Sequence, residues 1–247
     1  MVEPNSRIIR WMTWSGLVCI VVIAGGMLLA RQLPPPAATL RAEQIAQRFV
    51  EHKNWIRLGC VLMIFGIALW ACFVAVINLW IRRMERGTPI LTYLSLILSA
   101  VGTFIFFLFP FLWVVAAFRP ETISPDIIIT LNDTAWLAFL WLATPFTLWF
   151  LLIAVAIFQD RNETRILPRW VAYLNVFFAL DSLCGLTTAF LKSGPLSWTG
   201  VISFWNPLTV TFVWIVAMTV TMDRALKQRE TQEWATEEAE RPLALAN

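Results

Sequence analysis

The sequence predicts an all-α integral membrane protein, a bundle of six transmembrane helices. Of its 247 residues, 59% are hydrophobic and only 14% are charged, whereas a typical soluble domain has about 25% charged residues. The apolar residues also come in blocks of about twenty, the length a helix needs to cross the hydrocarbon core of a bilayer. We expect one membrane domain, 1–222, with spans at about 11–30, 55–80, 89–117, 134–158, 168–191 and 201–222.

The first apolar span could be mistaken for a signal peptide, because basic residues precede it. Its apolar run is longer than the roughly 7–15 residues of a signal peptide, and Leu28 stands where a cleavage site needs a small residue. We therefore expect a retained helix. Pro34, Pro35 and Pro36 then prevent the helix from continuing. The segment from Thr39 to Val50 has apolar residues on one side, which predicts a short amphipathic helix in the first loop, lying in the membrane interface.

The loop before the fourth span contains a helix-start signal. Ser124, Pro125 and Asp126 supply a cap, a proline at the first helical position and an acid in the first turn. This pattern predicts a short interfacial helix that ends at Ile129, with the fourth span then capped at 132 or 133.

The last two spans are separated by a short turn around Gly194 and Pro195, and the chain ends in a charged extension. Residues 223–247 carry six acids and four bases. We expect a solvated helical tail on the cytoplasmic side.

The distribution of lysine and arginine sets the expected orientation. Six spans place both termini on one side, which then holds 12 of the 19 basic residues. Because basic residues accumulate in cytoplasmic loops, both termini are expected in the cytoplasm. The first loop conflicts with this assignment, and its bases are expected to face anionic lipid headgroups or a partner. These bases are Arg31, Arg41, Arg48, Lys53 and Arg57.

Cysteine, histidine and motif content exclude several kinds of site. The four cysteines lie in apolar segments without a CxxC pair, which is typical of packing residues. The single histidine, His52, lies in a polar loop, so a multi-histidine haem or metal site is excluded. No HExxH, GxSxG or phosphate-binding glycine loop occurs. We expect no enzyme activity, no catalytic residue, no cofactor and no metal.

Tryptophan is abundant, with 14 residues. Several lie near span ends, as in an aromatic belt at the membrane interface: Trp11, Trp14, Trp55, Trp80, Trp170 and Trp198. Trp70, Trp149 and Trp214 lie deeper, and they are expected either to face lipid or to pack between helices.

Asp181 is the only acidic residue deep inside an apolar segment, where an ionisable group is costly. On a helical wheel it shares a face of about 140° with small and polar residues. Three readings remain open: a neutral carboxyl bonded to a neighbouring helix, a proton or ion relay, and a ligand contact. The candidate ion- or ligand-binding residues on this face are Asp181, Asn175, Ser182 and Thr188.

Two stretches carry a resemblance, ILPRWVAYLNVFFAL and GPLSWTGVISFWNPLTVTFVWIVAMT, together with the order of the segments EQIAQRF, RLGCVLMIFG, AAFRPE and LND. Here the chain resembles a group of uncharacterised polytopic integral membrane proteins, found mainly in actinobacteria. The resemblance implies a multi-pass protein of the bacterial cytoplasmic (inner) membrane. It implies no activity and no functional residue.

Two functions are compatible with these patterns. The first is a non-catalytic accessory or scaffold component that binds membrane lipids, other membrane proteins or further copies of itself. The alternative is a small secondary transporter, or a proton- or cation-coupled permease, that uses Asp181. The net charge of +3 is small, and no nucleic-acid partner is expected.

Overall fold

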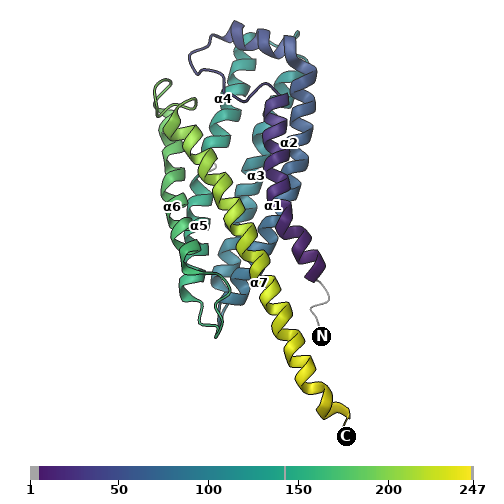
Figure 1. Ribbon diagram of the computed structural model, residues 1–247. Helices are drawn as coiled ribbons and strands as arrows, with labels where there is room; N and C mark the ends of the chain where they lie inside the picture. Colours follow the sequence, from purple (N-terminus) through teal and green to yellow (C-terminus); the bar gives the residue numbers. More distant parts are fainter. Residues whose placement is uncertain (1–5, 142, 246–247) are drawn as a thin grey trace.

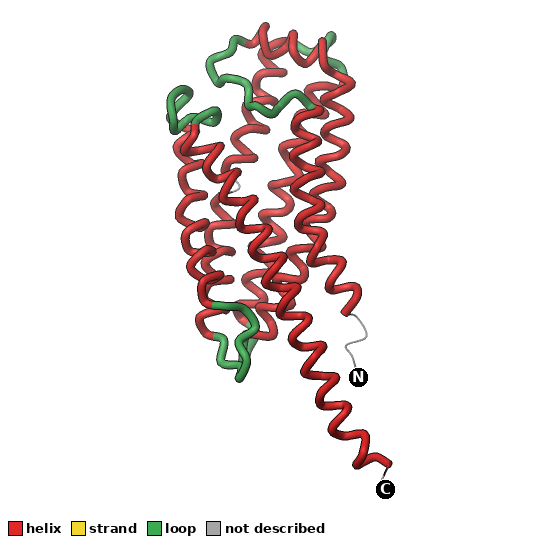
Figure 2. Tube along the Cα trace, viewed as in Figure 1, coloured by secondary structure: helices red, strands yellow, loops and turns green. Residues whose placement is uncertain are grey.

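The computed structural model describes residues 6–141 and 143–245, and this part of the chain is all-α, without strands. It contains six helical segments long and apolar enough to cross a membrane, which confirms the predicted fold class. The helices run side by side as one bundle, and the loops gather at its two ends (Figures 1 and 2).

Each of the six segments is one helix or two consecutive helices. The fourth consists of α4 and α5, the fifth of α6 and the 3₁₀ helix η1, and the sixth of the π-helix η2 and α7. The bounds are α1 Ser6–Leu29, α2 Ala42–Met84, α3 Ile90–Phe118, α4 Pro125–Trp141, α5 Ala143–Gln159, α6 Arg169–Ser182, η1 Leu183–Ala189, η2 Val201–Trp205 and α7 Asn206–Leu245.

The amphipathic segment of the first loop forms the beginning of α2, which continues into the second span without a break. The helix begins at Ala42 rather than at Thr39, because the side chain of Gln44 accepts a hydrogen bond from the Arg41 backbone N–H at 2.9 Å. These first turns lie across one end of the bundle (Figure 1). Ile45 and Phe49 are buried there, so the apolar side of the segment packs on protein.

The fourth span starts earlier than predicted. The helix α4 begins at Pro125, directly after Ser124, and Asn132 and Asp133 lie inside it instead of capping a second helix. The interfacial turn and the span share one buried face, which includes Ile128, Asn132 and Trp136 at helical spacing. Because this spacing is continuous, nothing separates the predicted short helix from the span.

Glycines allow α1 and α2 to pack closely. A Cβ on Gly59 would lie 2.3 Å from the Gly26 carbonyl oxygen and 2.6 Å from the Ala30 nitrogen. A Cβ on Gly66 would lie 2.6 Å from the Ile23 side chain. Small residues at such contacts let two membrane helices approach until their backbones touch.

The three deep tryptophans pack between helices rather than face lipid. The ring centroids of Trp70, Trp149 and Trp214 lie 6.0–6.2 Å from one another, and all three side chains are buried. They join α2, α5 and α7 in the core. Trp80 and Trp198, expected in the aromatic belt, lie near span ends but are also buried in protein.

The charged extension continues α7 without a break at residue 222, and its first turn belongs to the bundle. Asp223 is buried and pairs with Arg10 of α1 at 3.4 Å and with Lys227 at 2.7 Å. Arg10 also pairs with Glu230 at 2.7 Å, and Trp14 donates to Asp223 at 3.4 Å. These contacts fix the crossing of α1 and α7, and the two helices diverge from it toward the opposite end (Figure 1).

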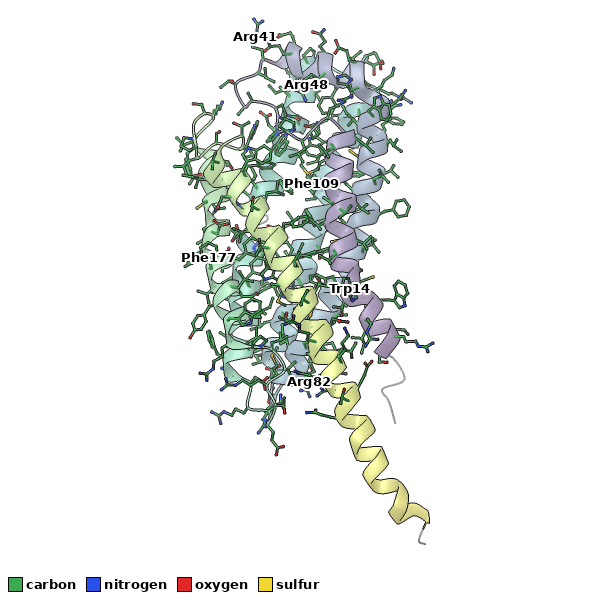
Figure 3. All side chains as sticks on the ribbon, in the orientation of Figure 1. Trp14, Arg41, Arg48, Arg82, Phe109 and Phe177 are labelled. Carbon is green, nitrogen blue, oxygen red and sulfur yellow. The ribbon has the colours of Figure 1, made fainter. Side chains whose placement is uncertain are left out.

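Arginines mark both ends of the bundle. Arg41 and Arg48 lie at one end and Arg82 at the other, the end where α1 begins and α7 finishes (Figures 1 and 3). Several first-loop bases have partners within the chain. Arg48 donates to the Arg31 carbonyl at 2.8 Å, Lys53 pairs with Glu121, and Arg57 donates to the last carbonyls of α3. Of these contacts, the Lys53–Glu121 ion pair offsets one positive charge, and the carbonyl contacts hold Arg48 and Arg57 in place without neutralising them.

Candidate functional site

The four predicted site residues do not converge on one site: Asp181, Asn175 and Ser182 of α6 make separate contacts with other helices, and Thr188 lies in the 3₁₀ helix η1. Asn175 is fully buried in α6, and its Oδ1 accepts a hydrogen bond from Trp214 Nε1 at 3.0 Å. Its Nδ2 donates to the Val171 carbonyl at 2.8 Å. Because the amide is used on both sides, Asn175 joins α6 to α7 and has little left to offer a ligand.

Ser182 and Thr188 are also used locally. The Ser182 hydroxyl lies 2.9 Å from the Thr147 hydroxyl of α5 and 2.9 Å from the Ala179 carbonyl. Thr188 donates to the Gly185 carbonyl at 2.7 Å. Both hydroxyls are therefore satisfied within the bundle, as hydrogen-bonding groups in an apolar environment must be.

Asp181 lies beside α7 and is only half-buried. Its Oδ1 accepts a hydrogen bond from the side-chain amide of Asn206, the first residue of α7. Its Oδ2 is buried and has no hydrogen-bond partner among the described residues. Asn206 itself is exposed, so the pair lies at the edge of the α6–α7 contact. The polar face of α6 thus supplies three separate interhelical contacts and not one converging site.

A second polar network, which the sequence analysis missed, joins three helices. Ser95 of α3 donates to Asn78 of α2, whose amide nitrogen in turn donates to Ser99 at 3.3 Å. Trp149 of α5 donates to the Ser95 hydroxyl at 2.7 Å. The two serines are four residues apart and so share a helix face. That spacing is a usable signal, but nothing in the sequence shows that Asn78 faces it.

An apolar cavity of about 180 Å³ lies in the membrane-spanning part. We call it the α1–α7 cavity, because residues 19–27 of α1 and 207–215 of α7 form two of its sides. On α1 these lining residues follow Arg10, and on α7 they precede Asp223, the residue with which Arg10 pairs. From that contact the two helices diverge toward the lining residues (Figure 1). Aromatic side chains line much of the remainder: Trp70, Phe106, Phe139, Phe146, Phe150 and Phe178.

The polar groups that line the α1–α7 cavity are almost all occupied. The hydroxyls of Ser182, Ser203 and Thr211 donate to backbone carbonyls at 2.7–3.0 Å. Trp214 uses its N–H on Asn175. Among the described residues, Trp70 is the one lining donor without an acceptor. The wall of the cavity therefore suits an apolar group.

The described residues contain no cluster of three or more His, Cys, Asp or Glu side chains that could hold a metal ion. His52 and Asp181 lie far apart in the sequence and in separate elements, α2 and α6.

No family model matches the chain, and neither does any curated protein or solved structure. The functional argument therefore depends on the geometry of the chain itself.

Proposed function

We propose that this chain is a non-catalytic membrane component that binds lipid, with the α1–α7 cavity as the site for part of a lipid chain. A role beside other membrane proteins, or in contact with further copies of itself, is compatible with such a component. The proposed location is the bacterial cytoplasmic membrane, with both termini in the cytoplasm.

The observation that carries the proposal is the chemistry of the cavity wall. Apolar cavities of about 150 Å³ in soluble proteins stay dry and bind benzene. The α1–α7 cavity is slightly larger, is almost wholly apolar, and lies where two membrane helices diverge. Acyl and isoprenoid chains are the most abundant apolar ligands available inside a bilayer, and filling the cavity with one recovers dispersion contacts with its aromatic wall.

Photocrosslinking tests this proposal. The full chain is reconstituted with a phosphatidylcholine that carries a diazirine in its acyl chain, and the labelled residues are mapped by mass spectrometry. We expect label on Leu208 and Thr211, which line the cavity. Ala24→Phe, which fills the cavity from α1, should reduce that label several-fold.

Val21→Phe is the matched control, because Val21 lies on the same helix, is 64% exposed and does not line the cavity. It should leave the labelling of Leu208 and Thr211 unchanged. Label confined to outward-facing residues, or equal loss in both variants, would contradict the proposal.

The alternative function, a proton- or cation-coupled transporter, is favoured by one observation. The Oδ2 atom of Asp181 is buried and has no partner, so it could accept a proton or contact a cation. Flux measurements in liposomes test this alternative. Transport that is present in the wild type and lost in Asp181→Asn, with the fold retained, would replace the lipid-binding proposal.

A further inference from the structure

A second hollow, of about 400 Å³, is lined by residues at the end of the bundle where α1 begins and α7 finishes. Its walls come from Trp80 near the end of α2 and Arg86 just after it, from the loop between α5 and α6, and from residues 225–232 of α7. It faces α7 at residues 225–232, whereas the α1–α7 cavity ends at 215. Ten residues of helix separate them by about 15 Å, so the two sites are distinct.

Positive charge dominates this second hollow. Arg86, Arg165 and Arg229 line it, and among the described residues that line it Glu163 is the only acid. Each arginine comes from a different wall. None of the three forms an ion pair within the described part of the chain. Three guanidinium groups against the one carboxylate of Glu163 leave the described lining with a net positive charge, which favours the entry of an anion.

The wall is held in place before any ligand binds. Asp160 is buried and accepts hydrogen bonds from the backbone N–H of Asn162 at 3.0 Å and of Ile166 at 2.8 Å, which fixes the loop. Arg86, two residues after the end of α2, donates to the Arg161 carbonyl at 2.7 Å, which ties the start of the α2–α3 loop to the loop between α5 and α6. A site whose side chains are already oriented loses less entropy when it binds.

Trp80 supplies a further unused donor. Its side chain lines the hollow and is 1% exposed, yet its indole N–H has no acceptor within the described part of the chain. The guanidinium carbon of Arg229 lies 5.9 Å from the centre of its ring. A buried N–H without a partner is costly, and an anionic oxygen in the hollow is the kind of acceptor that would satisfy it.

From this combination we infer that the hollow binds a phosphate group, held by Arg86, Arg165 and Arg229 against Trp80. Arginine matches phosphate geometry through paired N–H donors, and three arginines suit an anion with three or four acceptor oxygens. The volume lies within the roughly 300–1,000 Å³ of small-molecule sites. The group could belong to an anionic lipid headgroup or to a free phosphate compound. This inference is independent of the proposed acyl-chain cavity.

The test has two arms on the purified full chain. In uncharged detergent micelles without added lipid, sodium phosphate is titrated at constant ionic strength by calorimetry. In the second arm, native mass spectrometry counts bound phosphatidylglycerol against phosphatidylcholine. Binding of inorganic phosphate identifies a free phosphate compound as the ligand class, and selective retention of phosphatidylglycerol alone identifies a headgroup. Failure of both probes to bind would overturn the inference.

Four variants give the assay its specificity. Arg165→Gln and Arg229→Gln should each weaken binding about tenfold, because each removes charged hydrogen bonds to the anion. Glu163→Gln should strengthen it a few-fold. Arg169→Gln removes the same charge from the same end but does not line the hollow, so it should leave binding unchanged. Equal loss in Arg169→Gln would show only general attraction to positive charge and would overturn the site.

Discussion

Trp214 of α7 donates its indole N–H to Oδ1 of Asn175 in α6 at 3.0 Å, and both side chains are fully buried. Neither side chain is exposed at the surface of the chain. This bond therefore links α6 to α7, and loss of either partner would leave the other polar group buried without that hydrogen bond.

Asn175→Leu should lower the free energy of unfolding by about 1–2 kcal/mol, because it leaves the Trp214 N–H buried without an acceptor. Unfolding in mixed micelles measures the change. The double variant with Trp214→Phe completes a cycle that isolates the pair, and we expect a coupling of about 1 kcal/mol. A coupling near zero would mean that the bond contributes nothing to stability.

Gly59→Val should destabilise the protein by about 3 kcal/mol, because its side chain would overlap the backbone of α1 at Gly26 and Ala30. The loss of folded protein is measured by thermal unfolding in detergent. Gly25→Ala is the matched control on α1, since a Cβ there meets nothing within 4 Å. It should be neutral or slightly stabilising, and similar damage from both would rule out close packing as the cause.

Asp181→Asn should change stability by less than about 1 kcal/mol, because an asparagine can still accept a hydrogen bond from Asn206. Asn206→Leu should cost about 1–2 kcal/mol, since both oxygens of Asp181 then lack a partner. The same unfolding assay compares the two. The opposite order would show that the carboxyl acts through its charge or proton, which is what the transporter alternative requires.

Glu85, which lies outside the membrane-spanning helices, should make the free energy of unfolding depend on pH. Burial raises the pKa of Glu85, but hydrogen bonds from the Thr92 hydroxyl and from the N–H groups of Leu91 and Thr92, together with Arg82, outweigh burial and lower the pKa. The carboxylate thereby caps the start of α3 at 2.7–3.1 Å.

The pKa of Glu85 is lower in the folded state than in the unfolded state. The stabilisation by its carboxylate is therefore fully present above about pH 4.5, the usual glutamate pKa, and is lost as the pH falls through the pKa of the folded state. Glu85→Gln should therefore cost about 1 kcal/mol or less at pH 7 and nothing once the wild-type carboxyl is protonated. Unfolding of both proteins at pH 7 and in acid measures this difference. A cost independent of pH would contradict the role of the charge.

The position and number of the membrane spans could be predicted from the sequence, because blocks of about twenty apolar residues satisfy the bilayer whatever the helices contact. Helix-cap signals were less reliable where they overlapped a continuous apolar face of the same helix. The cap expected at Asn132 or Asp133 was wrong, since the buried face of α4 continues through those residues. No sequence motif pointed to the second hollow, because Arg86, Arg165 and Arg229 are far apart along the chain.

The sequence by itself predicted six helices long and apolar enough to cross a membrane. It also predicted one helix face shared by Asp181, Asn175, Ser182 and Thr188, but α6 ends at Ser182, and Thr188 lies in the 3₁₀ helix η1. Only the tertiary structure decided what that face contacts. A helical period fixes directions around one helix axis, but it leaves open which neighbour lies in each direction and at what distance. Packing of α6 against α5 and α7 gave the polar residues separate partners, and the divergence of α1 from α7 left the apolar cavity.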